Sequence, residues 1–384
     1  MNWKKWIPRT LSYILVAVLA SAVTMFAGIG QNSGNKLMQL QRIINQCFVG
    51  EADMEKAQDA AASAMVYALG DPWSYYIPAS EFSAHQEFKD NSTVAIGVNV
   101  GTREDNTGID ILGVSMGSAA DAAGIQPGDI LIKVDGQSIV GMTLDQATSL
   151  VRGEEGTELT VVVLRNGEEK SFTLKRQKVT VAAGKLLGDN IGLIRINNFN
   201  SNCAAETLAA IEQLQKEGAT KLIFDVRNNP GGYVSEMLEV LDHLLPEGVL
   251  FRQEDYLGNK SEESSDEACL KMPMAVLVNG DSYSAAEFFA AALREYDWAT
   301  VVGEKTFGKG YYQYTLSLSD GSAVNLSTGK YFTPKGVNLT EAGGLTPDVS
   351  VEVSEKTAEK IALNAIAFEN DPQIQAAVAA LQGK

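Results

Sequence analysis

The chain has 384 residues, a formal net charge of −17 at pH 7 and 45% hydrophobic residues. This length exceeds that of an ordinary single domain, so more than one hydrophobic core is expected. The negative charge argues against nucleic acid as a partner, because phosphate binding requires clustered Lys and Arg. The cysteines have neither CxxC nor His-spaced partners, so neither a metal site nor a disulfide framework is predicted.

An uncharged run covers residues 11–29 and is preceded by basic side chains within residues 1–10. Its length is close to the roughly 20 residues that span a bilayer, and the positive flank belongs on the cytoplasmic side. We therefore expect a cytoplasmic N-terminus, a single transmembrane anchor in the cell membrane, and an extracytoplasmic remainder. The competing interpretation is a signal peptide cleaved near residues 20–22, which would give a secreted protein.

Residues 31–89 are predicted to be mainly helical. Apolar residues recur at positions 37, 40, 43 and 44, and residues 57–69 form a second amphipathic stretch that ends at a Gly-Asp-Pro sequence. The aromatic cluster of residues 73–76 is expected to pack between these helices and the next domain. The Ala-rich residues 354–384 are predicted to form a C-terminal helical segment. Helical ends of this kind are candidates for a homodimer interface, but equally for packing on their own domain.

Residues 91–176 consist of short β-rich runs separated by turns. Strands are predicted at residues 94–100, 109–114 and 130–134, and Asn166-Gly167 is a strong hairpin signal. A helix is predicted at residues 144–151, because Thr143 and Gln146 before it have the spacing of a capping box.

This segment resembles a PDZ domain, on the residues AIGV at 95–98, GSAA and GIQPGDI within 117–130, and VDG at 134–136. The resemblance implies that a peptide adds as a strand, with its C-terminal carboxylate on backbone N–H groups and its last side chain in an apolar pocket. The loop that receives the carboxylate would contain Ala95, Ile96, Gly97 and Val98. Arg152, just past the predicted helix, is a candidate contact for gating the active site.

After residue 177 the predicted order becomes β-α-β-α, which indicates an α/β core with a mainly parallel sheet. Residues 191–196, 222–226 and 275–278 are the apolar strands, and residues 204–217 and 234–245 are the helices between them. Strands return within residues 314–353. The core is thus expected to cover residues 177–353.

Ser284 is the candidate nucleophile, because it follows a buried strand and a turn and begins a helix. Free N–H groups at a helix N-terminus stabilise the oxyanion that forms when a serine attacks a carbonyl. Ser282 on the same turn is the rival. The chain has only the histidines His85 and His243, and neither lies in a comparable setting, so imidazole is not expected to be the base.

Lys309, between Gly308 and Gly310, is the candidate base. A free lysine amine has a pKa of ~10.4, and burial lowers it by up to ~3–5 units, which would make the amine neutral. We expect Phe307 and the tyrosine pair at residues 311–312 to shield it from water. Gln313 is a candidate for holding the amine in place.

These pieces together resemble the carboxyl-terminal processing (tail-specific) serine peptidases. The matching sequences are DPWSYY at 71–76, DVRNNPGG at 225–232, SYSAAE at 282–287, GEKTFGKG at 303–310 and TPD at 346–348. The resemblance implies a crotonase- or ClpP-like protease core with an inserted PDZ domain.

The resemblance also assigns roles. The family's nucleophile falls on Ser284, its lysine on Lys309 and its glutamine on Gln313, with matching spacing. Its oxyanion donors would be backbone N–H groups of Gly231 or Gly232 and of Ala285. The expected substrates are proteins and peptides with free C-termini, and no metal or organic cofactor is needed. Two alternatives stay open: a PDZ adaptor whose core no longer cuts, and an acyl-CoA enzyme on a crotonase-like core.

Overall fold

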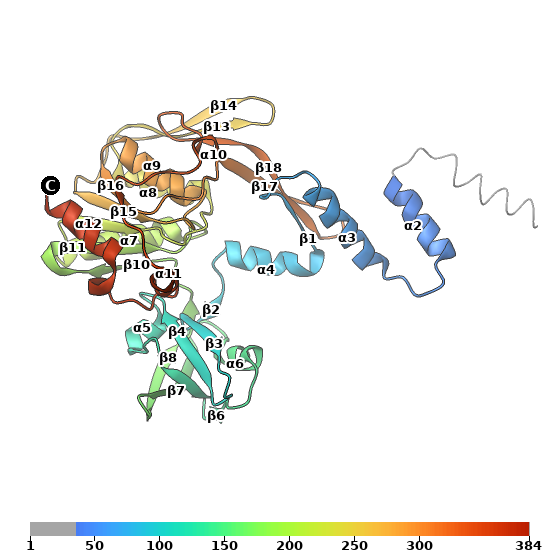
Figure 1. Cartoon of the computed structure of the whole chain (residues 1–384), viewed down its shortest axis with the longest axis horizontal. Helices are drawn as coiled ribbons and strands as arrows, with labels where there is room; N and C mark the ends of the chain where they lie inside the picture. The colour runs from blue at the N-terminus through green and yellow to red at the C-terminus, as the bar shows by residue number, and fades with distance from the viewer. Residues whose placement is uncertain (1–35, 384) are drawn as a thin grey trace, which may run out of the picture. The chain divides into compact units, whose positions relative to one another are not determined.

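The computed structural model describes residues 36–383, which divide into two units (Figure 1). The first unit contains the described residues up to Pro78 and residues Ser317–Asn325, and the second contains Ala79–Leu316 and the chain from Leu326 onward. The anchor predicted at residues 11–29 lies outside the described residues. Within residues 36–383, no helix combines the length and the apolar character that crossing a bilayer requires.

The first unit consists of helices α2 (Lys36–Cys47) and α3 (Met54–Tyr67), strand β1 (Tyr75–Ile77) and the tip of a hairpin. Both helices form where the apolar periodicity predicts them. The aromatic cluster does pack against these helices, since the hydroxyl of Tyr76 donates to Asp59 of α3 at 2.7 Å, but it also forms a strand: β1 pairs antiparallel with β18 (Ala323–Phe332) of the hairpin. Periodicity could not predict this strand, because its partner is far away in the sequence.

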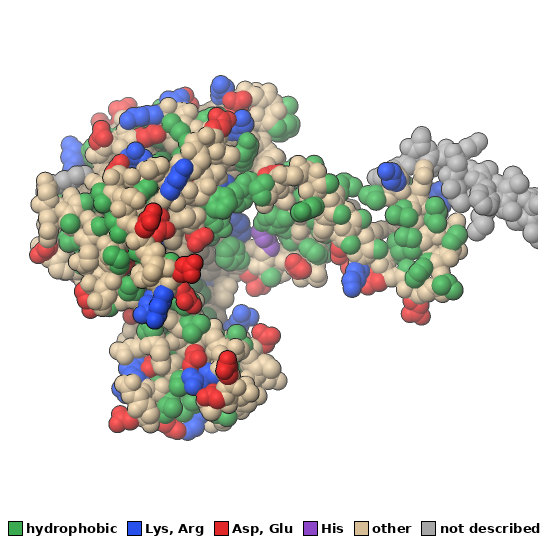
Figure 2. All heavy atoms as spheres, in the orientation of Figure 1, with side chains coloured by type: hydrophobic (Ala, Val, Ile, Leu, Met, Phe, Trp, Pro, Cys, Tyr) green, Lys and Arg blue, Asp and Glu red, His purple; other side chains and the backbone are tan. Residues whose placement is uncertain are grey.

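The first unit keeps much apolar surface in contact with solvent. No residue of α2 is buried, and Met38 and Leu40 on it are 57% and 51% exposed. Figure 2 shows hydrophobic side chains gathered over this helix.

The second unit contains a β domain with its own core. Its main sheet has the order β3-β4-β5-β7-β8, with β6 paired to β5, and β2 pairs separately with β9. The alternating residues Leu159, Val161 and Val163 of β7 are fully buried in this core. The elements are β2 (Val94–Ala95), β3 (Val98–Thr102), β4 (Ile109–Val114), α5 (Ala119–Ala123), β5 (Ile130–Val134), β6 (Gln137–Ser138), α6 (Leu144–Val151), β7 (Glu158–Arg165), β8 (Glu168–Lys175) and β9 (Gln177–Lys178).

The single strand predicted at residues 94–100 is divided in two at Gly97. Gly97 has φ +80°, and a Cβ there would lie 2.2 Å from the Cβ of Ser118. The backbone therefore turns at a position that only glycine accommodates. The predicted capping box of Thr143 and Gln146 is present at the start of α6.

The other part of the second unit is built on a sheet of order β10-β11-β12-β15-β16-β19. Strand β10 is antiparallel to β11, and all the following neighbours are parallel. The predicted α/β core with a mainly parallel sheet is confirmed. The strands are β10 (Ala182–Leu186), β11 (Ile191–Ile196), β12 (Lys221–Asp225), β15 (Met274–Val278), β16 (Ala299–Gly303) and β19 (Val349–Ser350).

Helices cover both faces of this sheet (Figure 1). Along β15, Met274, Val276 and Val278 face the core shared with α7 (Cys203–Lys216), α8 (Val234–Leu244) and α9 (Ala285–Glu295). Ala275 and Leu277 face the opposite core, shared with α12 (Pro372–Gln382). This alternation follows from the two-residue period of a strand. The C-terminal helix thus packs on its own domain.

A second sheet, which the sequence did not predict as such, has the order β1-β18-β13-β14, with β17 also paired to β18. Its hairpin of β17 and β18 begins at Tyr311, directly after the Gly-Lys-Gly sequence. The other strands and α-helices of the second unit have between 4 and 11 residues. These strands and helices are α4 (Ala79–Lys89), β13 (Gly248–Asp255), β14 (Lys260–Ser265), β17 (Tyr311–Ser317), α10 (Leu339–Ala342) and α11 (Glu355–Ala362).

Candidate active site

Ser284 lies between the end of β15 and the start of α9, where it is the N-cap residue. Its backbone has φ 57° and ψ −129°, a region that costs a non-glycine residue free energy and persists only when the surroundings enforce it. The side chain is almost buried, with 8% of the residue exposed. A strained serine at a strand-to-helix turn is the geometry of an activated nucleophile.

Ser282, the rival nucleophile, is fully buried and its hydroxyl is already used. The hydroxyl donates to the carbonyl of Val226 at 2.7 Å and accepts the N–H of Asn279 at 3.0 Å. It thereby joins the turn after β15 to the end of the neighbouring parallel strand β12. The geometry favours Ser284 over Ser282 as the nucleophile.

Of the two glycines after β12, Gly231 lies directly against Ser284. Gly231 has φ +84°, and a Cβ there would lie 2.8 Å from the Cβ of Ser284 and 2.9 Å from the amide nitrogen of Ala285. The N–H of Gly231 donates to Oδ1 of Asn229 at 2.8 Å. Within residues 36–383, no acceptor receives the N–H of Gly232 or of Ala285. Of the three predicted oxyanion donors, Gly231 is thus engaged elsewhere, and Gly232 and Ala285 are available.

A buried ionic cluster supports this glycine loop. Asp225 at the end of β12 pairs with both Arg227 and Arg195 at 2.7 Å, and Arg227 also pairs with Asp371 at 2.9 Å. Burial opposes the ionisation of Asp225, but the two arginines outweigh it and hold the pKa of this carboxyl well below its usual range. Sequence inspection missed this cluster; its only signal was charged residues directly after an apolar strand.

The lysine loop connects β16 to β17 and meets the turn that carries Ser284. The N–H of Phe307 donates to the carbonyl of Ser282 at 3.2 Å. The backbone N–H of Lys309 donates to Oε2 of Glu287 at 2.8 Å, and the N–H of Ser284 donates to the same oxygen at 3.0 Å. The structure thus brings the predicted nucleophile and the predicted base onto one acceptor.

The surroundings of the lysine amine include an aromatic side chain that the sequence did not single out. Lys309 is half-buried, and its Nζ lies 5.9 Å from the ring centroid of Tyr283. Phe307 is 54% exposed, and Tyr312 is stacked on Tyr331 at 5.1 Å between ring centroids. Tyr283, on the turn that carries Ser284, thus lies beside the amine, and Phe307 packs against Tyr283 with 5.8 Å between ring centroids.

Gln313 lies on β17 and is partly buried. Its side-chain nitrogen donates to the carbonyl of Tyr311 at 3.1 Å and to Oγ of Ser327 at 3.0 Å. In this structure the amide nitrogen therefore serves the hairpin of β17 and β18. The predicted contact of Gln313 with the lysine amine stays a prediction.

The four residues predicted to bind a peptide lie together in the β domain. Ala95, Ile96, Gly97 and Val98 line a pocket of about 220 Å³ whose opposite wall is α6. Arg152, at the C-terminal end of α6, also lines it. No group of three or more His, Cys, Asp or Glu side chains within residues 36–383 is arranged to hold a metal ion.

Comparisons with known proteins agree with both parts of the second unit. Residues 190–351 match the model of peptidase family S41, and residues 111–165 match that of a PDZ domain. The chain is 33% identical over 343 residues to a probable CtpA-like serine protease of Staphylococcus aureus (strain COL), which covers 88% of this chain and 68% of that protein. A protein of the same description from Staphylococcus haemolyticus is 33% identical over 364 residues, 89% of this chain and 73% of that protein.

Two solved structures are also similar. The photosystem II D1 C-terminal processing protease is 27% identical, with a TM-score of 0.50 over 89% of this chain and 93% of that chain. A putative S41 protease from Bacteroides fragilis is 18% identical, with a TM-score of 0.52 over 76% of this chain and 83% of that chain, a similarity of fold alone. These relationships exclude the acyl-CoA alternative. The chain belongs to peptidase family S41 and is a C-terminal processing serine protease with a PDZ domain.

Proposed function

We propose that this protease is a membrane-anchored, extracytoplasmic endopeptidase that uses Ser284 as nucleophile and Lys309 as base. The observation that carries the dyad is the shared acceptor: the N–H groups of both residues donate to Oε2 of Glu287. The strained backbone of Ser284 and the free N–H groups of Gly232 and Ala285 support the same assignment.

In the proposed reaction, the neutral amine of Lys309 takes the hydroxyl proton as Oγ of Ser284 attacks the scissile carbonyl. The N–H groups of Gly232 and Ala285 stabilise the resulting oxyanion. The protonated amine then gives its proton to the leaving amine, and an acyl-enzyme remains. Water, deprotonated by the same lysine, hydrolyses that ester. Gln313 would hold the amine through its side-chain oxygen, because its side-chain nitrogen already donates to Tyr311 and Ser327.

The PDZ domain would select the substrate. A peptide that adds along β3 places its last side chain in the pocket of about 220 Å³ beside α6. The walls of this pocket are mostly apolar, which suits proteins whose C-terminal residue is apolar. The name of the photosystem II D1 C-terminal processing protease likewise describes cleavage at a C-terminus. Arg152 at the rim is the proposed contact through which an occupied pocket stimulates cleavage.

Site-directed variants and an active-site probe test the dyad. Ser284→Ala and Lys309→Ala should each lower kcat for a tail peptide by about 10⁴-fold or more. Lys305→Ala is the matched control, because this exposed lysine lies in the same loop. A fluorophosphonate should label Ser284 in the wild type and nothing in Ser284→Ala, although Ser282 remains. Cleavage by Ser284→Ala, or a label on Ser282, would contradict the proposal. If the folded wild type is not labelled at all, the alternative of a PDZ adaptor whose core no longer cuts would be favoured.

The anchor proposal rests on residues 11–29. Its length and positive flank favour a retained helix with the protease outside the cytoplasm. In cells, the full-length chain should stay in the membrane fraction after carbonate extraction and be degraded by protease added outside. A mature N-terminus beginning after residue 22 would instead establish a cleaved signal peptide.

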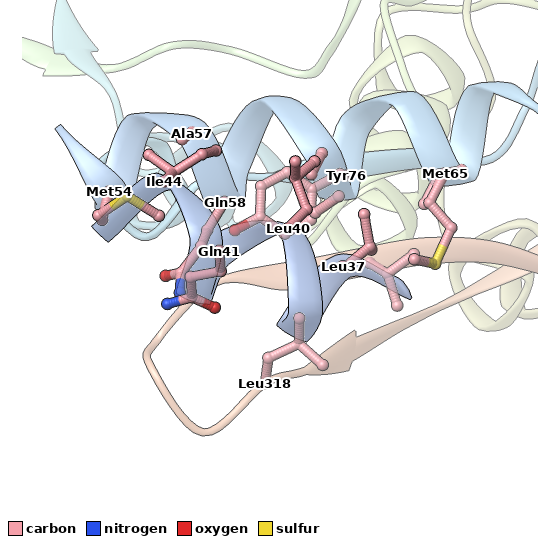
Figure 3. A pocket seen from close by; sticks show the side chains of 14 residues that line it. Leu37, Leu40, Gln41, Ile44, Met54, Ala57, Gln58, Met65, Tyr76 and Leu318 are labelled. Atoms are coloured by element: carbon pink, nitrogen blue, oxygen red, sulfur yellow. The ribbon is translucent and has the colours of Figure 1, made fainter. Parts of the chain in front are cut away.

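We further propose a homodimer formed through the first unit. An apolar groove of about 390 Å³ lies between α2, α3 and the hairpin tip (Figure 3). Leu37, Leu40 and Ile44 of α2 face Met65 of α3 and Leu318 of the tip across it. In a monomer, the apolar side chains that line this groove would stay exposed to solvent. A second copy supplies the same apolar surface, so that each groove is covered in a self-complementary interface.

A further inference from the structure

Glu287 is a fully buried acid in an otherwise apolar stretch of helix α9. It has no exposed surface, and its neighbours Ala285, Ala286, Phe288 and Phe289 are buried as well. Burying a carboxylate is costly unless hydrogen bonds compensate for the lost water. The surroundings of Glu287 must therefore supply donors, and their identity indicates what the acid does.

Four donors surround the carboxylate of Glu287. Oε2 accepts the N–H of Ser284 at 3.0 Å and the N–H of Lys309 at 2.8 Å. Oε1 accepts the N–H of Gly308 at 2.7 Å and the hydroxyl of Thr306. One donor belongs to the nucleophile's turn and three belong to the lysine loop. The carboxylate is thus a physical link between the two segments that carry the dyad.

The direction of the Thr306 bond is determined by a further contact. Oγ1 of Thr306 accepts the N–H of Leu345 at 2.7 Å. Because a hydroxyl has a single proton, that proton is directed to Oε1 of Glu287. The acid therefore receives donors only, and each of its two oxygens receives two of them.

This arrangement requires an ionised carboxylate. A glutamine in the same place has one oxygen and one NH₂ group. Whichever way its amide is turned, the NH₂ group faces two donors and both bonds are lost. A protonated glutamate has the same defect to a smaller degree, because its O–H also points at a donor.

We infer that Glu287 is a positioning residue, which sets the separation between Ser284 and Lys309 by holding both backbones on one carboxylate oxygen. This inference rests on the proposed dyad. It assigns Glu287 no contact with the substrate, since its four bonds all go to the protein's own backbone and to Thr306. Its loss should lower the rate of the chemical step while leaving substrate binding nearly unchanged.

The test compares Glu287→Gln with Glu239→Gln, which removes an exposed acid from α8. Steady-state cleavage of a tail peptide, peptide binding to the PDZ domain and thermal unfolding are measured for each. Glu287→Gln should lower kcat by about 100-fold or more, because misplacing reacting groups by ~1 Å has an effect of that size. KM and peptide binding should change by less than threefold, and Glu239→Gln should match the wild type.

Thr306 provides a second pair of variants in case Glu287→Gln fails to fold. Thr306→Val removes one donor while preserving shape, and should lower kcat about tenfold with KM unchanged. Thr306→Ser keeps the hydroxyl and should restore kcat. A role in stability alone would lower the unfolding temperature of Thr306→Val but leave the kcat of the folded enzyme intact.

The possible failures are distinguishable. The positioning role is wrong, and the dyad stands, if folded Glu287→Gln retains kcat within threefold of the wild type while Ser284→Ala is inactive. If Glu287→Gln does not fold, the same criterion applies to Thr306→Val. If Ser284→Ala still cleaves the tail peptide, the dyad itself is wrong.

Discussion

The substitution Gly231→Ala should lower kcat more strongly than its effect on folding stability would suggest. Gly231 has φ +84°, and its Cβ in Gly231→Ala would lie 2.8 Å from the Cβ of Ser284 and 2.9 Å from both the nitrogen of Ala285 and the carbonyl oxygen of Tyr283. Carbon atoms in favourable contact are about 3.5–4.0 Å apart. Either the nucleophile or the glycine loop must therefore move by roughly 1 Å.

The matched control is Gly218→Ala. Gly218 follows α7 with φ +97°, and a Cβ there would meet no atom within 4 Å. Both variants carry the cost of a left-handed backbone, about 1–2 kcal/mol. Gly231→Ala adds overpacking in a buried site, about 1–3 kcal/mol. Urea unfolding should therefore give about 1–2 kcal/mol of destabilisation for the control and about 2–5 kcal/mol for Gly231→Ala.

Activity should distinguish the two variants more strongly than stability does. Because a ~1 Å displacement of a reacting group lowers rates about 10²-fold, kcat of Gly231→Ala should fall by that factor at a temperature where both variants are folded. Gly218→Ala should retain the kcat of the wild type. Equal destabilisation of the two variants together with full activity of Gly231→Ala would refute the reasoning, since it would mean that the loop does not press on the nucleophile.

Three further predictions concern stability and assembly. Asp225→Asn leaves the buried Arg227 and Arg195 underpaired and should lower the free energy of unfolding by about 3–5 kcal/mol; a loss under about 1 kcal/mol in urea titrations would contradict the assigned cluster. Burial raises the pKa of the Glu287 carboxyl against the opposing effect of its hydrogen bonds. Ionising this carboxyl therefore costs more free energy in the folded protein than in the unfolded chain, although its four donors bind the ionised form. The contribution of Glu287 to the free energy of unfolding is fully present below the ordinary glutamate pKa of about 4.3 and is lost as the pH rises through the raised pKa of the folded protein. From pH 4 upward, the free energy of unfolding should fall more steeply with pH for the wild type than for Glu287→Gln. The same pH dependence in both proteins would refute this. Leu40→Asp in the groove of the first unit should convert a dimer to a monomer in sedimentation experiments, whereas an unchanged mass would exclude this interface.

The local parts of the fold follow from sequence patterns. The continuous apolar run of β15 and the periodicity of α8 are local, so both elements form within a residue or two of their predicted bounds. The capping spacing before α6 is likewise a contact between residues three positions apart. Ser284 could be singled out for the same reason, because a strand, a turn and a helix start are contiguous there.

Only the tertiary structure determines which distant segments of the chain lie in contact. Three examples join parts of the chain that have no local relationship: β1 pairs with β18, Ser282 donates to the carbonyl of Val226, and the ring of Tyr283 lies beside the lysine amine. Glu287 illustrates this most clearly. In the sequence it is an ordinary acid in the first turn of a helix, and only the folded lysine loop supplies the donors that make it a buried link. Side-chain chemistry is local, but burial and hydrogen-bond partners depend on which segments meet.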